Sequence, residues 1–215
     1  EDSELLRVVA SGSRRDCYDF DYPILQLTYI EVLDADTYQF RIWSIDDLIH
    51  LESDVRGLRE ARILSGTGRT PTYYQFANVS GIRADGSYVV FKPIEDFDGE
   101  YYGNGYTISD IMIYGSATAC GKTNDLTMAG LFASAYNASI INVKVLNAAV
   151  YAANQATYVG GIVGYADTTI LSGNTFQGYI YSYGSPNLVN IGGIVGEAID
   201  CEVTDNTVAG YIKTE

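Results

Sequence analysis

The sequence has few of the residues on which most catalytic and nucleic-acid-binding sites depend. Its 215 residues include one histidine, three cysteines and four prolines, and its 13 basic side chains are outnumbered by 27 acidic ones, giving a net charge of −14. A chain this acidic repels phosphate backbones and anionic lipid, so we expect no nucleic-acid binding. No apolar run approaches the roughly 20 residues that span a bilayer, so we expect no membrane insertion.

The single histidine limits the catalytic chemistry that the chain can perform. A Ser-His-Asp or Cys-His pair, or a histidine-rich zinc site, would have to use His50. From Tyr106 onward there are only three bases, all lysines, and the eight acids do not recur at one repeat position. Neither the base of a polysaccharide lyase nor the paired carboxylates of a hydrolase is evident. We therefore expect a protein that is not an enzyme and needs no cofactor.

The three cysteines leave the disulfide pattern open. Cys17, Cys120 and Cys201 form no C-x-x-C pair, which excludes a zinc ribbon. One disulfide in any of three pairings, or three buried thiols, would fit the spacing. The chain begins without a methionine or a signal peptide, so we expect it to be a processed or excised piece of a longer protein.

A repeat of about 32 residues occupies the second half of the chain. Gly160-Gly161-Ile162-Val163-Gly164 recurs 32 residues later as Gly192-Gly193-Ile194-Val195-Gly196, and a weaker copy, Ala129-Gly130-Leu131-Phe132-Ala133, lies 31 residues earlier. Residues 174–180 match residues 206–212 at the same step of 32. Roughly three and a half units run from Tyr106 to the last residue.

Each unit reads as strands and turns, because short apolar stretches alternate with Gly, Asn, Ser and Asp. Such a unit cannot bury its own apolar face, but stacked copies can, which predicts a parallel β-helix with one coil per repeat and about 4.8 Å between coils. The box glycines should mark bends with positive φ or close approaches between coils. The step of 31 predicts that the early coil is offset by one residue. We expect no internal asparagine ladder.

The first part of the chain differs in composition. Residues 1–60 carry 14 acidic and 6 basic side chains, against 8 and 3 in residues 106–215. Ser44 and Asp47 form a capping box ahead of apolar residues at helical spacing, which predicts a helix from Ile45 to Arg62 that caps the solenoid. Alternating apolar residues at 23–33 and 37–43, with Asp34-Ala35-Asp36 between them, predict a hairpin.

The Gly-Gly-Ile-Val-Gly boxes resemble the GLUG-motif repeats of bacterial secreted and surface proteins. The segments that precede the boxes, in their order, support the resemblance over residues 43–215: Ser44-Ile45-Asp46-Asp47-Leu48, Tyr74-Gln75-Phe76-Ala77-Asn78-Val79, Lys92-Pro93-Ile94, Phe97-Asp98-Gly99 and Gly103-Asn104-Gly105-Tyr106-Thr107-Ile108-Ser109. The resemblance implies a right-handed β-helix exported to the cell surface or medium, and it supplies no catalytic residues. Ala129 and Ala133 depart from the box pattern, and residues 1–42 lie outside the resemblance.

The sequence thus predicts an all-β chain: a right-handed parallel β-helix with an N-terminal capping helix and an extended N-terminal strand segment. We expect an N-terminal β segment at 1–43, which either exchanges strands with another copy or packs on the solenoid. A capping helix and first coil follow at 44–105, and GLUG-like repeats occupy 106–215.

Four tyrosines form the candidate interaction surface. Tyr179, Tyr181 and Tyr183 share one face of a strand, and Tyr211 repeats Tyr179 one coil later. If Phe176 and Ile180 point inward, these rings point outward, unless a long loop covers them. Acidic residues offer a second possibility, a divalent cation bound at Asp167 and Asp200 or at Asp96, Asp98 and Glu100, although solvated turns explain them as well.

Three functions fit these features. We expect a non-catalytic extracellular structural or adhesive module, such as a self-assembling surface or filament subunit. The last coil shows no cap in the sequence and would be an unpaired β edge, which either continues in a longer chain or is covered by another subunit. Strand addition from the N-terminal segment of the next copy could cover that edge. The alternatives are a glycan-binding module that uses the tyrosine strip and an accessory region of a large secreted hydrolase. The expected partner is the chain itself or the continuation of a longer chain, and a surface glycan or another protein is a further candidate.

Overall fold

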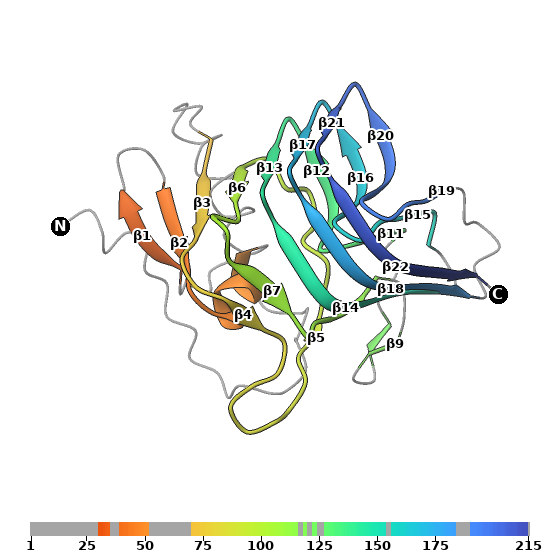
Figure 1. Cartoon of the computed structure of the whole chain (residues 1–215), viewed down its shortest axis with the longest axis horizontal. Helices are drawn as coiled ribbons and strands as arrows, with labels where there is room; N and C mark the ends of the chain where they lie inside the picture. The colour runs from red at the N-terminus through yellow and green to blue at the C-terminus, as the bar shows by residue number, and fades with distance from the viewer. Residues whose placement is uncertain are drawn as a thin grey trace.

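The computed structural model describes residues 30–34, 39–51, 70–115, 118–119, 122–123, 127–153, 156–183 and 190–214. These residues form a parallel β-helix, which confirms the predicted fold (Figure 1). Strands from successive repeats lie side by side, so that β14, β18 and β22 follow one another toward the C-terminal end of the solenoid.

Three coils of the same design make up the C-terminal half. Each coil has four strands in the same order, and equivalent strands of successive coils are hydrogen-bonded in parallel. The first coil contains β11 (Met128–Ala129), β12 (Phe132–Tyr136), β13 (Ser139–Ile141) and β14 (Lys144–Ala153). The second contains β15 (Tyr158–Val159), β16 (Val163–Asp167), β17 (Ile170–Ser172) and β18 (Thr175–Tyr183). The last contains β19 (Asn190–Ile191), β20 (Val195–Ile199), β21 (Glu202–Thr204) and β22 (Thr207–Thr214).

Shorter strands precede these coils and extend the same sheets. They are β3 (Thr72–Gln75), β4 (Val79–Ser80), β5 (Val90–Phe91), β6 (Glu100–Tyr102), β7 (Thr107–Ser109) and β8 (Met112–Tyr114). Strands β9 (Thr118–Ala119) and β10 (Lys122–Thr123) form a small antiparallel hairpin. We call the sheet that runs from β4 and β5 through β7, β8, β14 and β18 to β22 the long sheet, because it holds the longest strands.

The N-terminal hairpin is confirmed where the structure describes it. Strand β1 (Glu31–Asp34) pairs antiparallel with β2 (Gln39–Ile42), and β2 pairs in parallel with β3. The described part of the N-terminal segment therefore packs on its own solenoid. Residues 1–29, which include the predicted strand residues 23–29, lie outside the described residues, and strand exchange by them stays a prediction.

The register of the coils explains the two repeat lengths. Phe132 pairs with Val163 at a step of 31, and Val163 pairs with Val195 at a step of 32. The same change of step occurs in β13, where Ile140 pairs with Leu171. The predicted one-residue offset of the early coil is therefore confirmed, and inward-facing apolar residues align in spite of it.

Corners between the sheets are formed by residues in the left-handed conformation. Asn137, Thr168 and Asp200 occupy one corner in three successive coils with φ of 49°, 51° and 50°. Asn142 and Asp205 occupy the next corner at 55° and 56°, with Gly173 between them at 66°. Asn, Asp and Gly tolerate this conformation best, which explains why turn residues recur at the repeat period.

The box glycines are required by close packing. None of them has positive φ among the described residues, so of the two predicted reasons for these glycines the close approach between coils is the one that applies. A Cβ at Gly161 would overlap the Phe176 ring and the carbonyl oxygen of Gly193 in the next coil, and a Cβ at Gly193 would overlap Val208. Each box thus makes room for the large inward side chain of its own coil.

An internal asparagine ladder is present, contrary to the sequence expectation. The Asn174 side chain is fully buried; its Oδ1 accepts a hydrogen bond from the Val143 N–H at 2.9 Å and its Nδ2 donates to the Ile140 carbonyl at 2.8 Å. Asn206 repeats the pattern one coil later, accepting from the Asn174 N–H at 2.9 Å and donating to Leu171 at 2.7 Å. The offset that aligns Asn174 with Val143 hid this ladder in the sequence.

A helix covers the N-terminal end of the core. It begins at Ile45 as predicted and is described over residues 45–51; residues 52–62, the remainder of the predicted helix, lie outside the described part. Ile45, Leu48 and Leu51 are buried against the first coils. The terminal apolar surface at this end is thereby removed from water, as a solenoid requires.

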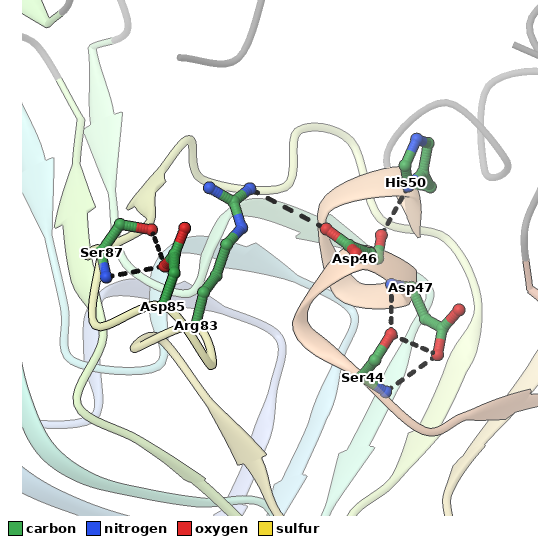
Figure 2. A network of polar contacts seen from close by, with 7 residues as sticks. All are labelled: Ser44, Asp46, Asp47, His50, Arg83, Asp85 and Ser87. Atoms are coloured by element: carbon green, nitrogen blue, oxygen red, sulfur yellow. Dashed lines mark hydrogen bonds and ion pairs between the residues drawn. The ribbon is translucent and has the colours of Figure 1, made fainter. Parts of the chain in front are cut away.

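The capping box that starts the helix is formed as predicted (Figure 2). The Asp47 carboxylate accepts the backbone N–H of Ser44 at 2.9 Å, while the Asp47 N–H donates to Ser44 Oγ at 3.2 Å. The same carboxylate also accepts the backbone N–H of Trp43 at 2.8 Å. The guanidinium group of Arg83, on the loop after β4, lies 3.9 Å from the carboxylate of Asp46 in the helix. In the same loop the hydrogen bonds from Ser87 lower the pKa of the exposed Asp85 carboxyl.

The asparagine ladder gives a stability prediction. Asn174→Ala leaves the buried Val143 N–H without a partner and removes one of the hydrogen bonds to the Ile140 carbonyl, which keeps its bond in the β13–β17 ladder, so it should lower the free energy of unfolding by about 1–3 kcal/mol. Asn206→Ala removes the equivalent hydrogen bonds in the more exposed last coil, where water replaces them, and should cost about 1 kcal/mol. Urea unfolding of both variants measures the difference, and equal losses would contradict a ladder that depends on burial.

Candidate interaction surface

The outer face of the long sheet carries the predicted tyrosine strip. Phe176 and Ile180 point into the core at 2% and 1% exposure, as predicted, so the intervening Tyr179 points outward and is 41% exposed. Tyr179 pairs in register with Tyr211, whose ring centroid lies 4.5 Å away. Tyr181 lies 6.2 Å from both rings, and its Oη is 3.2 Å from the Oη of Tyr211. The structure thus brings three of the four predicted residues together. The Tyr183 side chain lies outside the described part.

The strip continues into a ladder that the sequence analysis missed. Tyr114, Tyr151 and Tyr181 stack on consecutive strands of the long sheet. The centroids of Tyr114 and Tyr151 are 4.9 Å apart at an interplanar angle of 17°, and those of Tyr151 and Tyr181 are 5.3 Å apart at 10°. The stacked rings follow the spacing of the paired strands. Tyr151 therefore has a tyrosine against each of its two faces.

A bulge in β14 brings the ladder into register. The pairing of β14 with β18 shifts by one residue between Leu146 and Ala148, so that Tyr151 pairs with Tyr181. The extra residue, Asn147, has φ of 49° and hydrogen-bonds Asp110 of the preceding coil, itself at 54°. Without the bulge Tyr151 would oppose Ser182, because the step before the bulge is 31. The Asn at this position was the available sequence signal.

The last coil leaves its apolar positions exposed. Val208, Ile212 and Val203 pair in register with Phe176, Ile180 and Leu171 of the coil before. The earlier three are at most 2% exposed, whereas Val208 is 51% exposed and Ile212 and Val203 are 44% exposed. All eight residues of β22 are exposed, and among the described residues β22 pairs with β18 alone. This end of the solenoid is an apolar surface bordered by an open strand edge.

The acidic residues do not gather into a cation site in the part of the chain that the structure describes, where no three His, Cys, Asp or Glu side chains are placed to hold a metal. Asp96 bonds Ser134 at 3.0 Å, and Glu100 accepts from Thr72 and Tyr102. Asp167 pairs with Ile199 and accepts from Thr168, so it does not stack on Asp200. The solvated-turn interpretation fits Asp96 and Asp200, which are exposed and have positive φ, whereas Glu100 is half-buried within β6.

The remaining candidates have ordinary local contacts. His50 lies half-buried in the capping helix, where its Nδ1 hydrogen-bonds the Asp46 carbonyl one turn earlier (Figure 2). Cys201 is a free thiol in the last coil that donates to the Ile199 carbonyl at 3.1 Å. Cys17 and Cys120 lie outside the described residues. No described helix has the length and apolar character needed to cross a membrane.

Comparisons with protein-family models, with curated proteins and with solved structures found no match to this chain.

The hydroxyl contact at the end of the ladder gives a titration prediction. The hydrogen bond with Tyr181, with a smaller effect of burial, raises the pKa of Tyr211 above its ordinary value. In Tyr181→Phe that bond is absent, so Tyr211 should lose its proton at lower pH than in the unmodified chain. The pH dependence of the Tyr211 ring-carbon NMR signal measures this. Tyr74→Phe, which changes a distant stacked pair, is the control and should leave the Tyr211 pKa in place. An unchanged Tyr211 pKa in Tyr181→Phe would contradict the contact.

Proposed function

We propose that this chain is a non-catalytic structural module of the cell surface or extracellular medium, and that it assembles through its exposed C-terminal coil. The observation that carries the proposal is the exposure of Val203, Val208 and Ile212, whose counterparts one coil earlier are buried. Burying one such side chain is worth about 1.5–3 kcal/mol, so a β element that docks here gains several favourable contacts at once.

The open edge of β22, which borders this apolar surface, can pair with an added β-strand. The long sheet ends at β22 with a row of eight exposed residues, and an unpaired edge of this length is a template for pairing with another strand. A strand added here would hydrogen-bond to β22 and cover Val208 and Ile212 with its own inward side chains. This is the chemistry of β-strand addition.

The cellular setting rests on the resemblance of the boxes to GLUG-motif repeats, a family of exported proteins. The box glycines 161 and 193 have a packing role that any related coil with a large inward residue needs. We propose membership of that family on this combination of the boxes with the coils around them. Localisation at the cell surface or in the medium follows from the same proposal.

Glycan binding through the tyrosines has less support. A sugar stacks on a free ring face, but Tyr151 is covered on both faces, and Tyr181 is stacked on Tyr151 and makes a T-shaped contact with Tyr211. Of the described side chains in the strip and the ladder, Tyr179 and Tyr211 are the substantially exposed ones, and they lie against each other. The ladder is better explained as a device that ties successive strands together.

The structural role of the ladder predicts graded losses of stability. Tyr151→Ala removes two stacking contacts and should lower the free energy of unfolding by about 1–3 kcal/mol. Tyr211→Ala, at the exposed end, should cost less than about 1 kcal/mol. Urea unfolding checks both values. A glycan-array signal that Tyr211→Ala abolishes would contradict this role and favour the sugar-binding alternative.

The assembly proposal is tested by one charge on the exposed coil. Val208→Asp places a carboxylate on the apolar end, where it would be buried by any docked strand, and should weaken self-association by at least about tenfold. Val208 is already 51% exposed, so the isolated fold should tolerate the change. Sedimentation velocity over a range of protein concentrations measures the association.

The matched control is Gln177→Asp, which adds the same charge to the exposed outer face of β18, one coil away from the open edge. It should associate like the unmodified chain. Equal association of Val208→Asp and the unmodified chain, or the absence of concentration-dependent association in both, would contradict assembly through the last coil.

A further inference from the structure

In β22, inward-facing apolar residues lie at equal distances on either side of Gly210. Val208 and Ile212, two residues to either side, occupy inward positions in register with Phe176 and Ile180. Ala209 and Tyr211, one residue to either side, therefore point outward. An antiparallel copy of the same strand centred on Gly210 would place Val208 opposite Ile212 and the small Ala209 opposite the large Tyr211. Both sets of side chains would stay on their own face of the combined sheet.

At the other end of the solenoid, the long sheet offers in the described residues only the two-residue edges of β4 and β5, which are much shorter than the eight-residue β22. There the helix at 45–51 covers the core with Ile45, Leu48 and Leu51, and β1 runs antiparallel to the rest of its sheet. In Figure 1 this helix and β4, the strand that begins the long sheet, lie at the same end of the solenoid. A head-to-tail stack could pair β22 with β4 or β5 over only two residues and would leave the rest of the β22 edge open.

We propose that the element that covers the last coil is the last coil of a second copy of this chain. The two copies meet tail to tail about a two-fold axis through the facing Gly210 residues, with their β22 strands antiparallel. This inference rests on the proposed function, and it identifies the partner and the geometry. The contact is isologous, because the same strand serves both copies, so assembly stops at two.

The charge of the last coil distinguishes pairing with a second copy from docking of a basic partner. Within β22 the only side chain that carries a charge at neutral pH is Lys213, and in this register it lies opposite Thr207 of the second copy, so that the two lysines are at opposite ends of the pair. The remainder of the last coil carries four acids: Glu197, Asp200, Glu202 and Asp205. Two ends with the same net negative charge repel each other at low ionic strength. Salt therefore strengthens this contact, whereas it weakens docking of a basic partner.

Cysteine pairing across the contact tests the register. Ala209→Cys and Tyr211→Cys are purified separately as full chains, mixed and oxidised. The proposed pairing places residue 209 of one copy directly opposite residue 211 of the other, within disulfide reach. We expect a disulfide-linked dimer in the mixture in at least fivefold excess over either variant alone, with the 209–211 bond confirmed by peptide mass spectrometry. A mixture of Ala209→Cys with Lys213→Cys, two residues out of register, and the unmodified chain with its native cysteines are the controls.

Sedimentation separates the failure of this inference from the failure of the proposed function. We expect association that saturates at two copies and tightens at least about threefold from 50 to 500 mM NaCl. Open-ended growth beyond two copies, or a dimer that does not form the 209–211 disulfide, would overturn the tail-to-tail pairing and leave assembly through the last coil standing. A chain that stays monomeric at all concentrations would overturn both.

Discussion

Parallel hydrogen bonding of each coil to the next is the constraint on which the rest of this structure depends. A repeat of about 32 residues is too thin to bury apolar side chains by itself, so Phe176, Leu171 and Ile180 are buried only because a coil lies on each side. The corner residues, the box glycines and the asparagine ladder all serve this stacking. Each allows two backbones to approach while their polar groups remain paired.

Because each coil needs a neighbour on both sides, the two ends of the solenoid must be covered in some other way, and they differ in how this is done. At the N-terminal end the helix and the reversed strand β1 remove apolar surface and parallel edge from water. At the C-terminal end Val208 and Ile212 occupy core positions without a coil beyond them in the described part. We propose that this asymmetry is functional, and that a second copy supplies the missing layer. The tyrosine ladder joins consecutive strands of the long sheet, whose last strand, β22, would form the contact with the second copy.

Repetition made most of the fold predictable from sequence. The Gly-Gly-Ile-Val-Gly boxes predicted the coils, and the Ser44–Asp47 capping box predicted the start of the helix, because both are local signals. The asparagine ladder and the tyrosine ladder were missed because both depend on the register between successive coils. Asn174 aligns with Val143 through a one-residue offset, and Tyr151 reaches Tyr181 through the bulge at Asn147. An alignment that assumes a fixed repeat length hides such shifts of register. The exposure of Val208 depends on whether another coil packs on β22, and the sequence of one repeat does not encode this.

Hydrogen exchange of the β22 backbone amides, followed as a function of protein concentration, tests the central claim most directly. If the last coil is closed by a second molecule, the edge amides of β22 should exchange rapidly in dilute solution and slow at least tenfold as the dimer forms, while β14 amides stay slow throughout because both of their edges are paired. Slow exchange of β22 that does not change with concentration would show that the edge is covered within one molecule, and would contradict the account.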